Sequence, residues 1–280
     1  MPAKFRLKSH ISRMMKREAM PEADAYAREA LGVLADPEFA AVFGPGSRAE
    51  TPIIATLSDG AVVRGRDVAG VPAADDLAVR AAIALKHASG VDAGVTLTLD
   101  KRIPMGAGLG GGSSDAASVL LALNRLWSLH WSRAHLSALA ATLGADVPFF
   151  VGGTHAVARG IGENLTPVTL PSLWLALVHP PAHVRTADVF AAPELTRDSP
   201  SAKIDVFSEG YGRNDLAPVT AARFPAVAAS LAALRTAWPA ARMSGSGACV
   251  FAACPTEDDA KRALAALPAG VDRRLCRTLA

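Results

Sequence analysis

Residues 101–118 read KRIPMGAGLGGGSSDAAS, and this stretch places five glycines within seven positions. The preceding VTLTLDK, residues 95–101, alternates apolar and polar residues, which predicts a strand. The following SSDAASVLLALNRLW, residues 113–127, carries apolar side chains at helical spacing and predicts a helix. The glycines therefore join a strand to a helix, where they permit positive φ and let a ligand approach the peptide N–H groups closely.

The helix start after the glycines favours an anion, because its first N–H groups lack helical partners and carry partial positive charge. Ser113 and Ser114 add hydroxyl donors there. We therefore interpret residues 104–114 as a phosphate-binding loop. It is not a P-loop, because no lysine follows Gly112. A dinucleotide-binding fingerprint fits the glycines only weakly. Its strand–helix–strand unit, with a ribose-binding acid about 20 residues later, is not apparent, because that region is predicted to be helical. A flexible linker is disfavoured, because the glycines join two regular elements tightly.

Two further segments could carry chemistry. In LGADVPFF, residues 143–150, the Asp146 carboxylate could accept a proton from a hydroxyl group. Asp146 could equally cap a helix that has Pro148 in its first turn, and the residues alone leave both interpretations open. In RMSGSGACVFAAC, residues 242–254, a second turn of small residues precedes a strand. This turn could close over the same phosphates or could be only a tight connection.

Composition indicates a globular protein, because half of the 280 residues are hydrophobic and 20% are charged. The length suffices for two modest domains. The net charge of +3 comes without dense Lys/Arg clustering, so we expect no nucleic-acid partner. We also expect no membrane association and no targeting segment. Cys249, Cys254 and Cys276 lack metal-ligand spacing and fit a reduced cytoplasm.

The remaining pattern mixes strands and helices, which indicates an α/β or α+β chain with a domain boundary near 150–165. An Asp59-Gly60 pair between two β-prone runs predicts a hairpin. Asp75 or Asp76 is expected to cap the helix of residues 75–89, and residues 8–39 also suggest a helix. Ser132 is expected to cap a helix over residues 132–144, and Thr256 with Asp259 has the spacing of a capping box.

The three segments, in this order, resemble the GHMP family of small-molecule kinases. Residues 104–114 match that family's Pro-x-x-x-Gly-Leu-Gly-Ser-Ser-type loop, and SGSGA from Ser244 matches its late Gly-Ser-Gly turn. GAGLGGGSSDAA, LNRLW, LGADVPFF and VFAAPELTRDSP are most similar to the members that act on a diphosphocytidyl sugar alcohol. The resemblance extends from about residue 58 to the C-terminus.

The resemblance implies an α+β fold of two domains. Residues 1–160 would form the nucleotide-binding, ribosomal-protein-like N-terminal domain, and residues 161–280 the ferredoxin-like C-terminal domain. The implied activity is ATP-dependent phosphorylation of a sugar-alcohol hydroxyl in non-mevalonate isoprenoid precursor synthesis. The implied cofactors are ATP and Mg²⁺, and the partner is a small-molecule substrate. We expect a monomer or a weak homodimer.

The resemblance also assigns roles to individual residues. Asp146 would be the catalytic aspartate that accepts or polarises the substrate hydroxyl, and Lys4 would help to activate that hydroxyl. Thr186 and Phe190 would lie on the substrate side. Asp76-Leu77 stands where the family has Asn-Leu near its adenine pocket. The ATP phosphates would be held by Pro104, Met105, Gly106, Ala107, Gly108, Leu109, Gly110, Gly111, Gly112, Ser113 and Ser114.

The first 56 residues depart from the family pattern. Arg6 replaces an asparagine of the opening strand, and the Gly-Tyr-His that holds the cytidine base in the family occurs nowhere. Residues 34–60 are similar to the approach to a nuclease domain of bacterial helicase-nuclease subunits, but no acidic metal ligands follow, so we expect no DNA cleavage. Two hypotheses stay open: an active kinase, or a nucleotide-binding protein whose catalysis is impaired. Another GHMP kinase, acting on homoserine or mevalonate, is less favoured.

Overall fold

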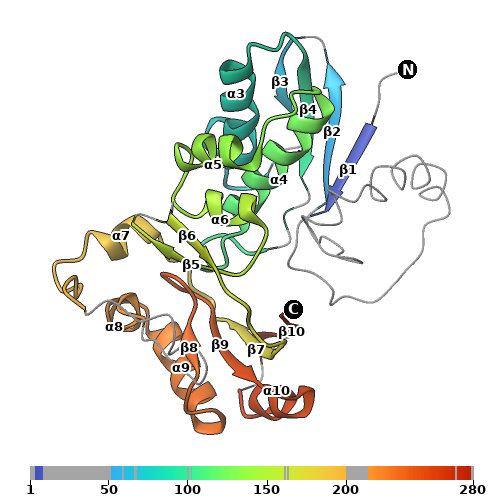
Figure 1. Ribbon diagram of the computed structural model, residues 1–280. Coiled ribbons are helices and arrows are strands. Elements are labelled where there is room, and N and C mark those ends of the chain that lie inside the picture. Colours follow the sequence, from blue (N-terminus) through green and yellow to red (C-terminus); the bar gives the residue numbers. More distant parts are fainter. Residues whose placement is uncertain are drawn as a thin grey trace. The chain divides into compact units, whose positions relative to one another are not determined.

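Figure 1 shows the computed structural model. It describes residues 4–8, 52–58, 60–65, 68–99, 101, 103–160, 162, 164–199, 214–268 and 270–278. The contacts divide the chain into two compact units. The first unit comprises Met1–Arg102 and Gly110–Val168, and the second comprises Ile103–Leu109 and Thr169–Ala280. The helix expected within residues 8–39 lies outside the described residues.

The first unit contains a four-stranded sheet in the order β1-β2-β4-β3. Its strands are β1 (Lys4–Lys8), β2 (Pro52–Ser58), β3 (Val62–Arg64) and β4 (Gly94–Leu99). The predicted hairpin at Asp59-Gly60 is wrong, because β4 lies between the two strands and pairs antiparallel with β2 and parallel with β3. The physical reason is the helix between β3 and β4: a strand–helix–strand crossover returns the chain parallel to its starting strand. The turn residues between β2 and β3 do not indicate whether β3 pairs with β2 or with β4.

Helices of the first unit begin and end at recognisable residues. Asp76 caps α3 by accepting a hydrogen bond from the Ala78 amide, and Gly90 ends it in the left-handed conformation. Ser132 caps α5 through the His135 amide, as predicted. The helices are the 3-10 helix η1 (Ala73–Asp75), α3 (Leu77–Ser89), α4 (Gly111–Leu126), α5 (Arg133–Ala141) and α6 (Val147–Gly152), followed by the paired strands β5 (Ala156–Arg159) and β6 (Asn164–Pro167).

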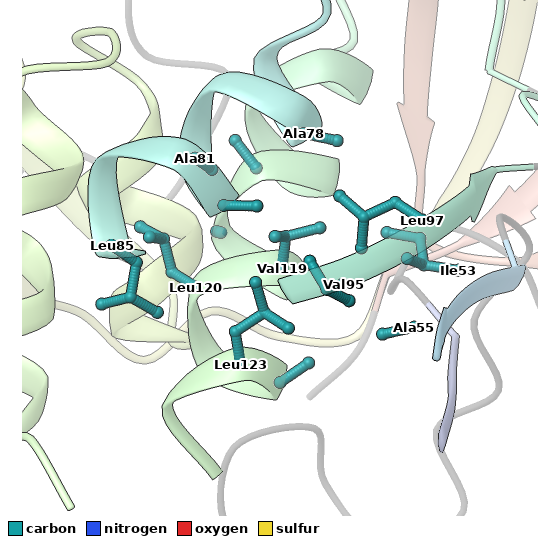
Figure 2. Packing of buried hydrophobic residues seen from close by; sticks show 14 of the residues in the cluster. Ile53, Ala55, Ala78, Ala81, Leu85, Val95, Leu97, Val119, Leu120 and Leu123 are labelled. Carbon is teal, nitrogen blue, oxygen red and sulfur yellow. The ribbon is translucent and has the colours of Figure 1, made fainter. Parts of the chain in front are cut away.

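The core of the first unit forms where α3 and α4 pack on each other and on the sheet. Figure 2 shows Leu85 of α3, Leu120 of α4 and Val95 of β4 among the side chains that converge there. Leu97 and Leu123 are also fully buried in this cluster. Burying such side chains contributes about 1.5–3 kcal/mol each, so this contact fixes α4, which carries the predicted phosphate loop at its start.

A buried charge network lies at the beginnings of α3 and α4. The Lys101 ammonium donates a hydrogen bond of 2.5 Å to Asp115 Oδ2 and lies 3.9 Å from Asp76 Oδ1. Arg64 Nη1 lies 3.5 Å from Asp76 Oδ2. Both carboxylates are almost fully buried. Burial raises the pKa of the Asp115 carboxyl above its usual value, while Lys101 acts in the opposite direction. Lys101 thus links two helices through their acidic side chains.

The second unit has a four-stranded antiparallel sheet in the order β10-β7-β9-β8. Counted along the unit, this is the order 4-1-3-2, and helices between the strands give the β-α-β-β-α-β succession of ferredoxin-like domains. The elements are β7 (Trp174–His179), α7 (Thr186–Phe190), α8 (Leu216–Arg223), α9 (Pro225–Ala237), β8 (Arg242–Met243), β9 (Val250–Cys254), α10 (Glu257–Ala265) and β10 (Asp272–Arg277). The expected two-domain α+β fold is confirmed.

Two further expectations concern the second unit. Thr256 caps α10, because its hydroxyl accepts a hydrogen bond from the Asp259 amide at 3.2 Å; the same hydroxyl donates to the Asp259 carboxylate at 2.5 Å. Among the residues that the structure describes, no single helix is long and apolar enough to cross a membrane, and α8 and α9 pass that test only as a pair bent by 117°.

We predict that Lys101→Met destabilises the first unit by about 3 kcal/mol at pH 7, because it leaves buried carboxylates without their cation. The loss should be smaller at pH 5. A carboxyl whose pKa is raised by folding stabilises the folded state below its usual pKa, and that contribution disappears as the pH rises through the folded value. Removing Lys101 raises the folded pKa of Asp115 further, so acidification recovers more stability in the variant. Urea unfolding at both pH values measures this difference.

Lys86→Met is the matched control. Lys86 Nζ donates to the carbonyls of Val91, Asp92 and Ala93 at 2.7–3.1 Å and neutralises no buried acid in these contacts. Its loss of stability should be the same at pH 5 and pH 7. An equally pH-independent loss for Lys101→Met would contradict the role given to Asp115.

We also predict that Cys249 and Cys254 resist thiol reagents in the folded protein. Both are fully buried, and burial raises the pKa of Cys249 to about 12 and that of Cys254 to about 11. Labelling at pH 8 with a coloured disulfide reagent should therefore modify Cys276, which is partly exposed, ahead of the other two. Labelling in denaturant should reach all three thiols at similar rates. Equal rates in the native protein would refute the prediction.

Candidate functional site

The predicted phosphate loop divides between the two units. Ile103–Leu109 belongs to the second unit, and Gly110 begins the return to the first. Within the second unit, the loop pairs with the backbone that precedes β9: the Ala248 amide donates to the Gly106 carbonyl, and the Cys249 amide donates to the Ala107 carbonyl, both at 3.0 Å. The loop is therefore hydrogen-bonded to the residues just before β9, which excludes the interpretation of the glycines as a flexible linker.

Gly108 lies against the second small-residue turn, residues 244–247. The Ser244 hydroxyl donates to the Gly108 carbonyl at 2.7 Å. Gly108 has a φ of +69°, and a Cβ there would lie 2.2 Å from the Ser244 carbonyl oxygen. No side chain fits at that distance, so glycine is required both by conformation and by space. The turn of residues 244–247 thus holds the first half of the loop in place.

The second half of the loop forms the start of α4 in the first unit. Gly110 is the N-cap in the left-handed conformation with a φ of +67°, and no side chain caps the helix. A Cβ at Gly110 would lie 2.8 Å from the ring of Phe150. Ser113 is half-buried and Ser114 is buried in the first turn. The helix therefore presents its first N–H groups and its positive dipole end without an internal acceptor from a capping side chain.

Asp146 is the N-cap residue of α6, but its side chain makes no capping hydrogen bond. The carboxylate is exposed, whereas the next two residues, Val147 and Pro148, are buried. Helix α6 packs against α4 and α5, so the backbone that carries Asp146 is fixed in the same unit as the α4 start. This geometry disfavours the helix-cap interpretation and leaves the carboxylate available to a ligand.

Lys4 lies in β1, where its Cα pairs with that of Thr56 in β2. The position of its side chain falls outside the described part of the chain. The proximity of Lys4 to Asp146 that the catalytic assignment implies therefore stays a prediction.

Thr186 and Phe190 both lie on the short helix α7 of the second unit. The Thr186 hydroxyl lies 2.8 Å from the Ser246 hydroxyl, which links α7 to the turn of residues 244–247. Phe190 is 54% exposed although the adjacent Val189 is fully buried. One face of α7 thus packs into the core while the other offers an aromatic ring to solvent.

Two residues that the sequence analysis missed hold the turn of residues 244–247. Asn214 Nδ2 donates to the carbonyls of Met243 and Gly245 at 2.9 and 2.7 Å. The buried Thr220 hydroxyl donates to the Ser246 carbonyl at 3.0 Å. A single asparagine and a single threonine outside any motif give no signal of this role, which depends on chain segments 26–31 residues apart.

The Asp76 carboxylate is already engaged within the first unit. It caps α3 and faces Lys101 and Arg64, as described above. No group of three or more His, Cys, Asp or Glu side chains that could hold a metal ion occurs among the described residues.

Comparisons with known proteins identify the family of this chain. Residues 76–154 match the GHMP kinases N terminal domain, and residues 197–272 match the GHMP kinases C terminal domain. A 4-diphosphocytidyl-2-C-methyl-D-erythritol kinase from Thiobacillus denitrificans is 53% identical over 227 residues, 81% of both chains. The corresponding kinase of Cupriavidus necator is 52% identical over 79% of this chain and 78% of its own.

Solved structures of similar fold include kinases of the same kind. A crystal structure of 4-(cytidine 5'-diphospho)-2C-methyl-D-erythritol kinase matches with a TM-score of 0.64 and 35% identity, covering 81% of this chain and 89% of that one. A homoserine kinase from Cytophaga hutchinsonii shares the fold, with a TM-score of 0.57 at 18% identity, covering 82% of this chain and 85% of that one. With both domain models matched and relatives above 50% identity over four fifths of its length, the chain belongs to the GHMP kinase family.

Proposed function

We propose that this protein is a small-molecule kinase that transfers the γ-phosphoryl group of ATP to the 2-hydroxyl of 4-diphosphocytidyl-2-C-methyl-D-erythritol. The observation that carries the proposal is Asp146: an exposed carboxylate at a helix start that it does not cap, in a family of kinases. The relatives at 51–53% identity supply the substrate, because each is named a kinase of this alcohol.

The residues present fit a bound triphosphate. Gly108 and Gly110 are left-handed residues that the Ser244 carbonyl and the Phe150 ring approach too closely for a side chain, and α4 begins directly after Gly110 without a side-chain cap. Amides of Gly111 and Gly112 and the Ser113 hydroxyl would donate to phosphate oxygens. Mg²⁺ is part of the proposal; it would neutralise phosphate charge and take most of its ligands from phosphate and water oxygens.

In the proposed reaction, Asp146 accepts the proton of the substrate hydroxyl as that oxygen bonds to the γ-phosphorus. The bond from the γ-phosphorus to the bridging oxygen breaks, and ADP leaves. Catalysis in such transfers comes mainly from positioning and from stabilising charge on the transferred group. We also propose that Lys4 helps to activate the same substrate hydroxyl.

On the substrate side, we assign Thr186 and Phe190 to recognition of the diphosphocytidyl group. The exposed Phe190 ring offers a flat surface for the cytosine base, and stacking of a base on an aromatic side chain contributes about 1–3 kcal/mol. The Thr186 hydroxyl is held by Ser246 and keeps further hydrogen-bonding capacity.

A second candidate is a nucleotide-binding protein with impaired catalysis. The observation that favours it is the absence from the sequence of the Gly-Tyr-His expected around the cytidine base. It predicts binding of ATP without phosphoryl transfer, so assays of turnover and of binding on the same preparation separate the two.

Replacing Asp146 with alanine should lower kcat by about 10²- to 10⁴-fold, because the proton acceptor is lost. ATP binding should be unchanged when it is measured as the rise in melting temperature that Mg-ATP causes. ADP release coupled to a dehydrogenase, with the diphosphocytidyl alcohol as substrate, measures turnover. Asp258→Asn is the control, because Asp258 is also an exposed acid in the first turn of a helix, α10. Equal rates for Asp146→Ala and the wild type would exclude the proposed role.

Gly108→Ala should abolish stabilisation by Mg-ATP. The wild type at 100 times its Kd should gain about 2.7 kcal/mol, whereas the variant cannot place a Cβ beside the Ser244 carbonyl and must displace the loop. Gly90→Ala is the control, because Gly90 has a φ of +70° and a Cβ added there would meet no atom within 4 Å. Both substitutions strain a left-handed residue, but only the first perturbs the loop. A normal ATP response in Gly108→Ala would argue against phosphate binding there.

A further inference from the structure

Helix α7 is held at its carboxyl end by two arginines, one from the segment that follows it and one from α8. Arg197 Nη2 donates to the Phe190 carbonyl at 2.7 Å and to the Ala192 carbonyl at 3.2 Å, and its Nη1 donates to the Leu195 carbonyl at 3.0 Å. Arg223 Nη1, from the last turn of α8, donates to the Asp188 carbonyl at 3.1 Å. Cations at this end of a helix satisfy carbonyls that lack helical partners and oppose the negative end of the dipole.

A helix of five residues is too short to be stable by itself. Helix α7 is anchored on one side by Val189, which is buried in the core together with Ala192 and Leu195. The exposed side, with Thr186 and Phe190, receives no such support from packing. The direction of the Phe190 ring therefore depends on the direction of its own backbone, which Arg197 holds by the Phe190 carbonyl.

We propose that Arg197 is a positioning residue that sets the substrate-binding face of α7. It acts through Phe190 and does not itself contact substrate. The inference rests on the proposed function, because it assumes that Phe190 meets the diphosphocytidyl group. It predicts that losing Arg197 weakens binding of the alcohol substrate selectively and leaves ATP binding and the transfer step intact.

The geometry requires a guanidinium. Two nitrogens of one planar group reach three carbonyls that surround the end of α7, spread over residues 190–195. A lysine has one nitrogen and cannot span that set, so it should keep only part of the contacts. The conservative substitution therefore tests whether the number of carbonyl contacts matters, and not only the charge.

Steady-state kinetics of Arg197→Ala and Arg197→Lys test the proposal. Arg197→Ala should raise KM for 4-diphosphocytidyl-2-C-methyl-D-erythritol by about tenfold, with kcat and KM for ATP within about twofold of the wild type. Arg197→Lys should give an intermediate KM. The matched control is Arg273→Ala, which removes an equivalent contact of 2.9 Å with the Leu264 carbonyl at the end of α10 and should behave as the wild type.

A double-mutant cycle with Phe190→Ala shows whether Arg197 acts through the ring. In the Phe190→Ala background, Arg197→Ala should raise KM for the alcohol by less than about twofold. Additive effects would overturn the proposal, as would an unchanged KM in Arg197→Ala or an equal rise in KM for ATP. Hydrogen exchange of the Val189 and Ala191 amides, which bond within α7, should accelerate in Arg197→Ala and not in Arg273→Ala.

Failure of the proposed function gives a different result. If the wild type does not phosphorylate the alcohol, the proposed function fails and the specificity role of Arg197 fails with it. If the wild type is active and the variants keep its KM, only the role of Arg197 is overturned. Unchanged exchange in α7 would overturn it as well, because Arg197 would then not hold the helix.

Discussion

The close approach of two backbone segments at Gly108 is the constraint on which the second unit's part of the site depends. The carbonyl of Ser244 occupies the space that a side chain at residue 108 would need, and the Ser244 hydroxyl bonds to the Gly108 carbonyl. Asn214 and Thr220 in turn fix the backbone around Ser244 by donating to neighbouring carbonyls. The loop is thus held through its carbonyl groups, which leaves its N–H groups for the phosphate binding that we propose. Close backbone contact and hydroxyl hydrogen bonds to carbonyls explain why glycine and serine are frequent in the loop and in the turn of residues 244–247.

In the first unit, an ion pair neutralises an acidic side chain near the start of α4. An acid on α4 one turn from its start would oppose the binding of a polyanion there, and Asp115 occupies that position. Its pairing with Lys101 cancels this charge locally, and Lys101 also faces Asp76 at the start of α3. This pairing keeps the buried acid from opposing the anion binding that we propose at the helix start. The cost of burial is visible in the raised pKa of Asp115.

The substrate side follows a different principle. Helix α7 is short. Besides the buried Val189, contacts at its ends hold it: a hydroxyl pair between Thr186 and Ser246, and arginine contacts with its last carbonyls. Thr186 thereby connects the helix that carries Phe190 to the same turn that holds the phosphate loop. Within the second unit, one turn of four residues contacts both the proposed nucleotide-binding segment and the proposed substrate-binding segment. Substitutions in that turn are therefore expected to affect both substrates together.

Much of the local structure was evident in the sequence. Alternation indicated β4, helical spacing indicated α3 and α4, and the caps at Asp76, Ser132 and Thr256 were predicted correctly, because these signals involve residues within one or two turns of each other. The family resemblance implied the two-domain fold, and both domain models confirm it. The hairpin at Asp59-Gly60 was wrong, because pairing of β3 with β4 depends on a crossover helix and not on the turn itself.

Only the tertiary structure showed that Asp146 does not use its side chain as a cap, and that the loop divides at Leu109 and Gly110 between two units. Only it brought Asn214, Thr220 and Arg223 to their carbonyl partners. The physical reason is that a hydrogen bond from a side chain to a distant backbone carbonyl requires a donor but no particular sequence at the acceptor. Patterns of neighbouring residues therefore determine the elements of this protein, and the folding of distant segments against each other decides which polar groups remain available for a ligand.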